Sequence, residues 1–403
     1  MKAGWRRVRL GEVCAISSAL VDPRQKQYRN LPHVGGANIE SATGGLINIK
    51  SAREEGLTSG KFVFEPSMVL YSKIRPNLMK AAKPDFKGLC SADIYPLSPD
   101  RPQLDRNYLF YLLLSAEFTE FAVAGSARAG IPKVNRDYLF GFEFHLPPLR
   151  EQARISLLLD EAFAAIAVAR ANAERNLQNS RTLFESHLRL VFTQHGNEWA
   201  KKPLAELCDI KHGFAFDGSQ FSSDVPEGNP IVLTPGNFTE AGVLLFNTRN
   251  TKRFSGQVPE SFRFKIGDLV LVMTDLSPKM NILGKPAFIE TNNILHNQRI
   301  GRVIFSNNTV EKRLVYYFMM SACFLEDIRR SATGTMVRHT APSRILSTII
   351  TFPRETKEQV RTVARLDLLR DRIQRLEAIY QQKLAALDEL KKSILHQAFS
   401  GHL

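Results

Sequence analysis

Apolar residues recur three and four positions apart over residues 146–191, which is the spacing of one face of an α-helix. Pro147 and Pro148 stand at the start of this stretch, where they end any preceding strand, and Glu151 and Gln152 follow in the first predicted turn. No Gly or Pro occurs after them in the stretch. The pattern predicts a helix of roughly forty residues, about 60 Å long. Such a helix needs a partner of similar length to cover its apolar face.

Residues 353–403 have the same character and predict that partner. Their apolar residues follow a heptad repeat that only Lys383 interrupts. We predict that the two helices pair through one apolar seam. The predicted seam consists of Leu159, Ile166, Leu183, Leu190, Leu366, Leu369, Ile373, Leu376, Tyr380, Leu387, Leu390 and Ile394.

The two helical stretches also match in sequence when Glu151-Gln152 is aligned with Glu358-Gln359. The matched identities are Arg154 with Arg361, Asp160 with Asp367, Ile166 with Ile373, Leu183 with Leu390, Ser186 with Ser393 and Phe192 with Phe399. The segment from Trp5 to Ile16 shares its spacing of Trp, Leu, Glu, Cys and Ile with the segment from Trp199 to Ile210. The glycine-rich residues 33–46 likewise have a counterpart in residues 233–244. These correspondences, all in one order, indicate a duplicated chain.

The duplication predicts a first domain (1–145), a long helix (146–196), a second domain (197–352) and a second long helix (353–403). Short β-branched and aromatic segments between Gly and Pro predict strands in both domains. The predicted strands are residues 46–49, 62–64, 68–71, 140–144, 230–233, 269–273, 286–289, 300–305 and 347–352, and the predicted helices are 107–124 and 310–331. Strands with few helices and no strict alternation indicate the α+β class. If the ends of the second domain are close together, the long helices form an antiparallel coiled coil between two domains related by a pseudo-twofold axis.

Composition narrows the class of protein. The apolar fraction of 44% is that of a globular chain, and no apolar run in the 403 residues is long enough to cross a membrane. The N-terminus lacks the apolar segment of a signal peptide, so we expect a cytoplasmic protein. The four cysteines are far apart, which favours small buried side chains over a disulfide or a metal site. The formal net charge of +14 favours a polyanionic partner, with nucleic acid as the first expectation.

Motifs of catalysis and cofactor binding are missing from the sequence. Gly60-Lys61 and Gly284-Lys285 lack the rest of a phosphate-binding loop, and no GxGxxG occurs. The nine His residues have no metal-ligand spacing. We therefore expect a non-catalytic binding protein with no metal and no cofactor of its own.

Basic loops at matching places in the two domains are the best binding signal. Residues 71–87 and 126–136 carry cations in the first domain, and residues 273–286 and 334–344 do so in the second. Cations neutralise phosphates, and Arg and Asn also bind base edges. The predicted DNA contacts are Lys73, Arg75, Asn77, Lys80, Lys83, Arg128 and Lys133 in the first domain and Lys279, Asn281, Lys285, Arg338, His339 and Arg344 in the second. Taken singly, each of these residues is as well explained as a solvated surface charge.

The chain resembles the specificity subunits of type I restriction-modification systems along nearly its full length. The resemblance rests on LPPLREQ at the start of the first long helix, TFPRETKEQ at its twin, WRRVRLGEV and WAKKPLAEL at the start of each half, and HVGGANIESATGGL. The second helix entry departs from the first in lacking the double proline.

The resemblance implies two target-recognition domains, each reading one half of a split sequence in double-stranded DNA, with the long helices as a conserved spacer. It also implies docking of two adenine methyltransferase (modification) subunits and of restriction subunits that hydrolyse ATP and cut DNA. S-adenosylmethionine, ATP and Mg²⁺ would then belong to those partners. Two alternatives stay open: a fused restriction-modification enzyme, and a scaffold that binds proteins rather than DNA.

Overall fold

The structure is a computed structural model that describes residues 4–16, 19–127, 130–194, 196, 198–257, 260–306 and 309–403. The chain divides into two compact units. The first unit consists of Met1–Glu174 and Gln381–Leu403, and the second unit of Arg175–Tyr380. Each unit therefore contains one mixed α/β domain and one part of each long helix.

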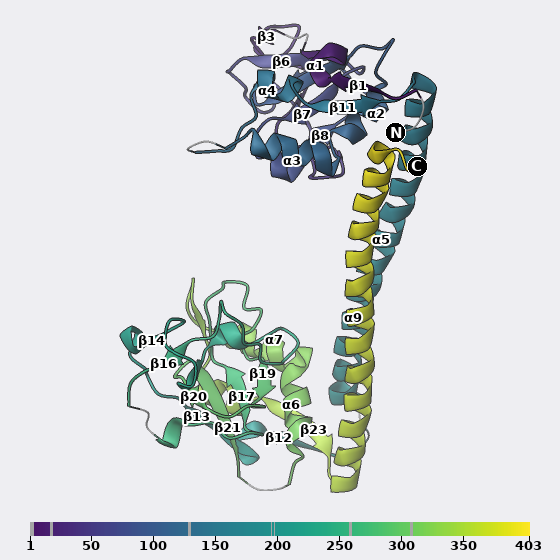
Figure 1. Cartoon of the computed structure of the whole chain (residues 1–403). Helices are drawn as coiled ribbons and strands as arrows, with labels where there is room; N and C mark the ends of the chain where they lie inside the picture. Colours follow the sequence, from purple (N-terminus) through teal and green to yellow (C-terminus); the bar gives the residue numbers. More distant parts are fainter. Residues whose placement is uncertain are drawn as a thin grey trace. The chain divides into compact units, whose positions relative to one another are not determined.

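Two 45-residue helices, α5 (Leu149–Thr193, teal in Figure 1) and α9 (Thr356–Ser400, yellow), are the longest elements. Helix α5 begins directly after Pro147 and Pro148, where the sequence predicted its start. Glu151 and Glu358 lie in the first turns, where a carboxylate suits the positive end of the helix dipole. Within the described residues, no helix is both long and apolar enough to span a membrane.

The described residues of the first unit form three antiparallel or mixed sheets and four short helices. The sheets are β1 (Arg6–Arg9) with β11 (Glu143–Leu146); β2 (Cys14–Ile16), β10 (Ile94–Pro99), β7 (Val69–Ser72) and β8 (Ala81–Ala82) in that order; and β3 (Leu20–Val21), β6 (Lys61–Phe64), β9 (Gly88–Cys90), β4 (Pro32–Val34) and β5 (Lys50–Ser51) in that order. The helices are α1 (Leu10–Val13), α2 (Arg106–Leu112), α3 (Ala116–Ala124) and α4 (Arg136–Phe140), with a 3₁₀ turn η1 at Pro76–Leu78.

The main core of the first unit joins its domain to both long helices. Tyr108 and Phe118 are fully buried, and they share this core with Ile155 and Leu159 of α5 and with Leu395 of α9. Each such apolar side chain contributes about 1.5–3 kcal/mol when it leaves water. The ends of the chain meet at the same core, because Trp5 and Phe399 both pack against it.

The second unit also contains a mixed α/β domain, which its sheets and short helices form together. Its sheets are β12 (Trp199–Pro203) with β23 (Ile349–Pro353); β13 (Cys208–His212), β21 (Ile300–Phe305), β17 (Leu269–Val272) and β19 (Pro286–Phe288) in that order; β14 (Phe221–Ser222), β16 (Arg253–Phe254), β15 (Ile231–Leu233) and β20 (Ile294–His296) in that order; and β18 (Thr274–Asp275) with β22 (Arg338–His339). Its helices are α6 (Lys312–Met320), α7 (Ala322–Ser331) and α8 (Pro342–Leu346), with 3₁₀ turns η2 (Leu204–Glu206), η3 (Gly218–Gln220), η4 (Pro235–Asn237) and η5 (Glu260–Phe262).

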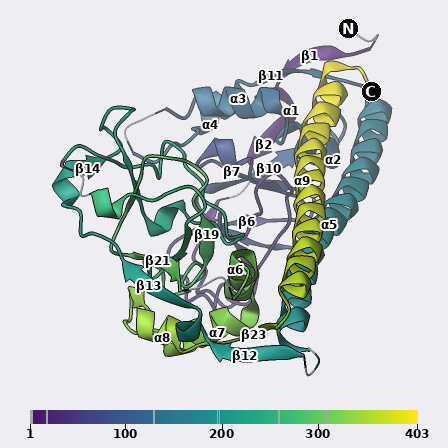
Figure 2. The ribbon, with the colours of Figure 1, turned by 90° about the horizontal axis from the view of Figure 1, so that it is seen from below.

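Helix α6 fastens the second domain to the long helices. Its apolar residues from Leu314 to Met320 are all buried. Figure 2 shows α6 between the strands of its unit and α9. Tyr317 packs against Phe184 of α5, and its hydroxyl donates a hydrogen bond to Asp367 of α9 (2.5 Å).

The structure corrects several element predictions. Each predicted domain helix is two helices, because Ser115 and Ser321 accept a hydrogen bond from the backbone N–H three residues on and so start α3 and α7. Residues 46–49 form no strand; Leu46 makes only an isolated bridge to Ile39. The predicted strand 140–144 lies instead at β11, because residue 140 ends α4.

The predicted seam is wrong at four leucines. Leu183, Leu190, Leu376 and Leu390 are 56%, 46%, 39% and 47% exposed. By contrast, Leu159, Ile166, Leu366 and Ile373 are buried, and Leu369, Tyr380, Leu387 and Ile394 are half-buried.

The buried positions of α5 explain the difference. They recur every seven residues from Leu159 through Ile166 and Ala173 to Ser180 and then move to Leu188 and Phe192, which belong to the core of the second domain. The last turns of α5 therefore bury a different face from the one that continuous counting predicts.

Candidate nucleic-acid interface

The two basic loops of the first domain lie side by side, although nearly forty residues separate them in sequence. The backbone N–H of Val134 donates to the carbonyl of Lys73, and the N–H of Arg75 donates to the carbonyl of Pro132, both at 2.9 Å. Ile74 and Lys133 form the bridge between these bonds. The separately predicted loops thus make one surface.

The second domain joins its two basic loops in the same way. Strand β18 pairs with β22, so that Thr274 faces His339 and Asp275 faces Arg338. The N–H of Thr340 donates to the carbonyl of Met273 (2.9 Å), which matches the bond between Val134 and Lys73. We call the paired loops of each domain its basic hairpin: residues 73–75 with 132–134, and residues 273–275 with 338–340.

The residues predicted to contact DNA differ in their exposure to solvent. Arg75, Asn77, Lys279, Asn281 and His339 are exposed, and Lys80, Lys133, Arg338 and Arg344 are half-buried. Arg75 has a left-handed backbone (φ 51°) at the start of η1. Asn281 donates to Glu240 (2.8 Å), and His339 pairs with the hydroxyl of Thr274 (3.1 Å). Arg128 lies outside the described residues.

Three predicted contacts, Lys73, Lys83 and Lys285, point into the protein, and we remove them from the candidate interface. Lys73 is buried and donates to the carbonyl of Ala92 (2.5 Å). Lys83 donates to Asp160 of α5 (3.0 Å) and to Asn107, so it ties the domain to the helix. Lys80 is half-buried rather than buried, but its ammonium also donates to a carbonyl, that of Gly36 (2.5 Å).

The third is Lys285, which is buried beside a cavity of about 320 Å³ between α5, α9 and the second domain. Burial, together with the nearby positive charge of Arg329, lowers the pKa of its ammonium to about 8, while Glu185 and Glu240 oppose the shift. An ammonium so placed is turned away from any DNA surface.

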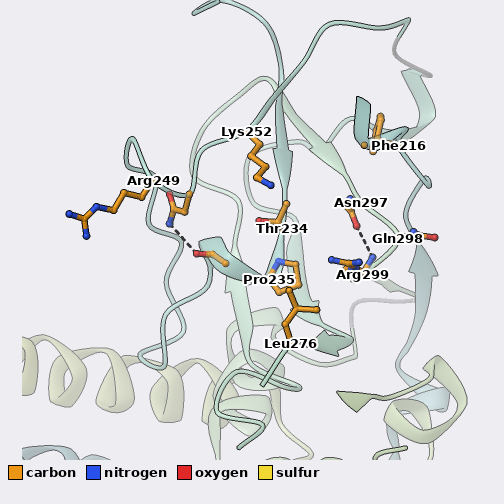
Figure 3. Close-up of a pocket in the computed structure, with 12 residues that line it drawn as sticks. Phe216, Thr234, Pro235, Arg249, Lys252, Leu276, Asn297, Gln298 and Arg299 are labelled. Carbon is orange, nitrogen blue, oxygen red and sulfur yellow. Dashed lines mark hydrogen bonds between the residues drawn. The ribbon is translucent and has the colours of Figure 1, made fainter. Parts of the chain in front are cut away.

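A second cavity, of about 430 Å³, opens beside the basic hairpin of the second domain (Figure 3). Leu276, which follows β18 directly, forms part of its wall with Phe216, Thr234 and Pro235. The side chains of Lys252 and Arg299 point toward the space in front of Thr234 and Pro235, whereas those of Arg249 and Gln298 point away. Cations and amides around a concave apolar surface suit a nucleotide.

Sequence reasoning missed Arg249, Lys252, Gln298 and Arg299. These residues lie outside the predicted basic loops and come from two short segments that only the fold brings together. A signal was nevertheless present, because the polar triplet Asn297–Arg299 interrupts two apolar strands. Within the described ranges, no group of three His, Cys, Asp or Glu side chains is arranged to hold a metal ion.

Comparison with known proteins identifies the first part of the chain. Residues 2–174 match the family described as the type I restriction modification DNA specificity domain. This part of the chain is therefore similar to that family over 173 of the 403 residues. The family predicted from the sequence is confirmed.

Proteins similar to this chain include specificity subunits of type I restriction enzymes. The chain is 33% identical to the type I restriction enzyme EcoDI specificity subunit of Escherichia coli over 188 residues, which are 47% of this chain and 41% of that subunit. It is 24% identical to the MjaVIII specificity subunit of Methanocaldococcus jannaschii over 336 residues, which are 79% of this chain and 75% of that subunit. The match to the EcoDI subunit thus spans less than half of either protein.

Solved structures share the fold of this chain. One is a chain from work on complex assembly and conformational transition of the type I R-M system, with a TM-score of 0.81, 22% identity and coverage of 100% of this chain and 99% of the other. Another is the HsdS subunit from Thermoanaerobacter tengcongensis, with a TM-score of 0.61, 22% identity and coverage of 100% and 98%. The predicted mixed α and β architecture with a long helix is confirmed.

Proposed function

We propose that this chain is the DNA sequence-specificity subunit of a type I restriction-modification complex, and that each of its two domains reads one half of a split target. The observation that carries the proposal is the basic hairpin. In each unit the fold brings two distant basic loops together through equivalent backbone bonds. The similar proteins, which are specificity subunits, support the same reading.

We infer that the two units are copies of one ancestral unit. Gln152 accepts a hydrogen bond from the N–H of Asp105 and donates to the carbonyls of Gln103 and Pro147. Gln359 makes the same three kinds of bond, with Glu311, Thr309 and Pro353. Asp160 likewise accepts from Tyr111 as Asp367 does from Tyr317. Such detailed agreement supports the duplication.

We also infer that α5 and α9 form one antiparallel coiled coil. In the first unit Arg170 pairs with Asp388, and in the second unit Arg181 pairs with Glu377. Eleven residues separate the two arginines, and eleven separate their two partners in the opposite direction. The equal intervals support a common register, which a spacer between two reading domains requires.

In this proposal the chain has no catalytic activity and works in the cytoplasm. Two modification subunits and the restriction subunits dock on it and supply the chemistry. They bind S-adenosylmethionine, ATP and Mg²⁺. The long helices hold the modification subunits near each half of the target.

Duplex binding by the purified full chain tests the proposal. We expect affinity for double-stranded DNA that falls steeply with added salt, because each neutralised phosphate contributes roughly 0.9 to the slope of log K against log salt concentration. A protein scaffold with incidental positive charge would show no duplex binding at physiological salt. A fused restriction-modification enzyme would cleave or methylate DNA on its own when Mg²⁺, ATP and S-adenosylmethionine are added.

A further inference from the structure

We propose that Arg299 determines the sequence preference of the second domain by binding a guanine of its half-site. This inference rests on the proposed DNA-binding function and goes beyond it, because it assigns one residue to one kind of base. Arg299 is the last residue of the turn Asn297–Arg299, which joins β20 to β21 and borders the cavity of Figure 3.

The turn holds the backbone of Arg299 firmly. Asn297, itself buried, accepts the N–H of Arg299 on its side-chain oxygen (3.0 Å), and its carbonyl accepts the N–H of Ile300 (3.0 Å). The N–H of Gln298 donates to the carbonyl of Phe214 (3.0 Å). A side chain that starts from a fixed point loses less freedom when it binds.

The guanidinium of Arg299 is available for a ligand. Across the ranges that the structure describes, it makes no hydrogen bond or ion pair with the protein, and the residue is exposed. Arg302, three positions along, shows the opposite arrangement, since it pairs with Asp268 at 2.9 Å. Figure 3 shows the side chain of Arg299 directed toward Pro235 and the exposed Leu276. A planar guanidinium donates two parallel hydrogen bonds to O6 and N7 of guanine, the commonest specific contact in the major groove.

The first domain has the opposite charge at the equivalent position. Strands β4 and β9 pair in parallel there, as β15 and β20 do in the second domain, and the turn that follows is Ser91–Asp93. The N–H of Ile94 donates to the carbonyl of Ser91 (2.9 Å), just as Ile300 donates to Asn297. Asp93 lies 3.6 Å from the ammonium of Lys73 and 3.9 Å from that of Lys133. A carboxylate accepts hydrogen bonds and cannot serve the acceptors of guanine, so the first domain cannot make the same contact at this position.

Selection of binding sites from randomised duplexes tests this inference with the full-length chain. We expect the unmodified chain to require a guanine at one position of one half-site. Arg299→Ala should lose that preference by roughly tenfold or more and leave the other half-site unchanged. Arg299→Lys keeps the charge but lacks the planar fork, so it should bind with similar salt dependence and without the preference. Arg249→Ala is the matched control, because Arg249 borders the same cavity and points away from it.

Two results would overturn the inference while leaving the proposed function intact. One is an Arg299→Ala chain that keeps the guanine preference. The other is an equal loss of affinity for all duplexes with a salt slope lower by about 0.9, which marks a phosphate contact. If the unmodified chain shows no salt-dependent duplex binding, the proposed function itself fails, and the inference fails with it. Unchanged thermal unfolding of each variant shows that the fold is intact.

Discussion

The side-chain oxygen of Gln152 accepts a hydrogen bond from the backbone N–H of Asp105 at 2.8 Å, and this bond joins the start of α5 to the start of α2. The Gln152 amide also donates to the carbonyls of Gln103 and Pro147, each at 2.8 Å, and the residue is fully buried. Asp105 in turn accepts the N–H of Tyr108 and so caps α2. One glutamine therefore satisfies three backbone groups where the domain meets the helix.

Replacing Gln152 by Ala should lower the free energy of unfolding by about 1–3 kcal/mol per backbone group left without a partner. The physical reason is that these groups stay buried when the side chain is removed. Urea denaturation followed by circular dichroism measures the change. Gln178→Ala is the control, because Gln178 is exposed on the same helix. Equal stabilities of the two variants would show that water replaces the lost bonds at no cost.

The side chains of Tyr111 and Asp160, which share a hydrogen bond of 2.5 Å, should contribute to stability in an energetically coupled way. Burial and the neighbouring carboxylate both raise the pKa of the Tyr111 hydroxyl, which therefore stays a donor at neutral pH. In a double-mutant cycle of Tyr111→Phe with Asp160→Asn, we expect a coupling energy of about 1 kcal/mol. Thermal or chemical unfolding of the four chains measures it. Strictly additive effects would mean that the two side chains act independently.

Acid should destabilise the second domain through His296. Burial lowers the pKa of this imidazole to about 4, and its Nε2 lies 2.8 Å from the carbonyl of Ile300. Because the pKa in the folded state lies below the unfolded value of about 6.5, the unfolded chain takes up the proton first. The stabilisation is complete above pH 6.5 and falls as the pH drops toward 4, by about 3 kcal/mol in all.

Comparison of His296→Phe with the unmodified chain isolates this contribution. The variant should lose less unfolding free energy between pH 7 and pH 4.5, since it has no group that titrates at this position. His212→Phe, an exposed change in the same unit, should behave like the unmodified chain. The same acid sensitivity in all three chains would assign the effect to carboxylates.

Arg75→Ala should weaken duplex binding about evenly across sequences and lower the salt slope by about 0.9, as expected for one lost phosphate contact. Arg75 is exposed on the basic hairpin of the first domain. Arg101→Ala removes the same charge from an exposed position outside the basic hairpin and should change the slope little. Titrations at several salt concentrations separate the two variants. Equal salt slopes for the two variants would indicate that duplex affinity depends only on the net charge of the chain.

Lengthening both long helices should change the preferred gap between the half-sites. Seven residues inserted after Leu177 and seven after Tyr380 add one heptad at facing positions, if the register of the two cross-helix ion pairs continues. The addition lengthens the pair by about 10 Å, or roughly three base pairs of DNA. Selection of split sites from a pool with variable gaps measures the result. A gap unchanged by the insertions would refute the role of the helices as a spacer.

Periodicity in the sequence was enough to predict both long helices, because apolar spacing and the prolines at Pro147 and Pro148 are local signals. It failed at Leu183 and Leu190, since which face a helix buries depends on what lies beside it. Strands of two or three residues such as β8 and β18 were missed, because they are too short for a repeating pattern. The loops of the basic hairpins were predicted, but their pairing depends on the fold.

The residues of the candidate site likewise differ in how far the sequence could predict them. Arg75 and His339 are exposed as a DNA contact requires, whereas Lys83 and Lys285 face inward, and charge alone does not distinguish the two cases. Arg299 was overlooked because it belongs to no basic stretch. What marks it is a guanidinium that has no partner among the described residues and lies beside a cavity, and both facts are properties of the folded chain.

On the domain side, Gln152 and Gln359 bind only main-chain atoms: N–H groups of Asp105 and Glu311, and carbonyls of Gln103 and Thr309. Main-chain groups are the same whatever side chains surround them. These bonds depend on the main chain of the domain alone, whereas the bonds of Tyr111 to Asp160 and of Tyr317 to Asp367 each require one tyrosine of the domain. A domain that keeps this tyrosine and the apolar residues buried against the long helices could therefore differ elsewhere on its surface, and recombination between such domains would give new DNA preferences on the same pair of helices.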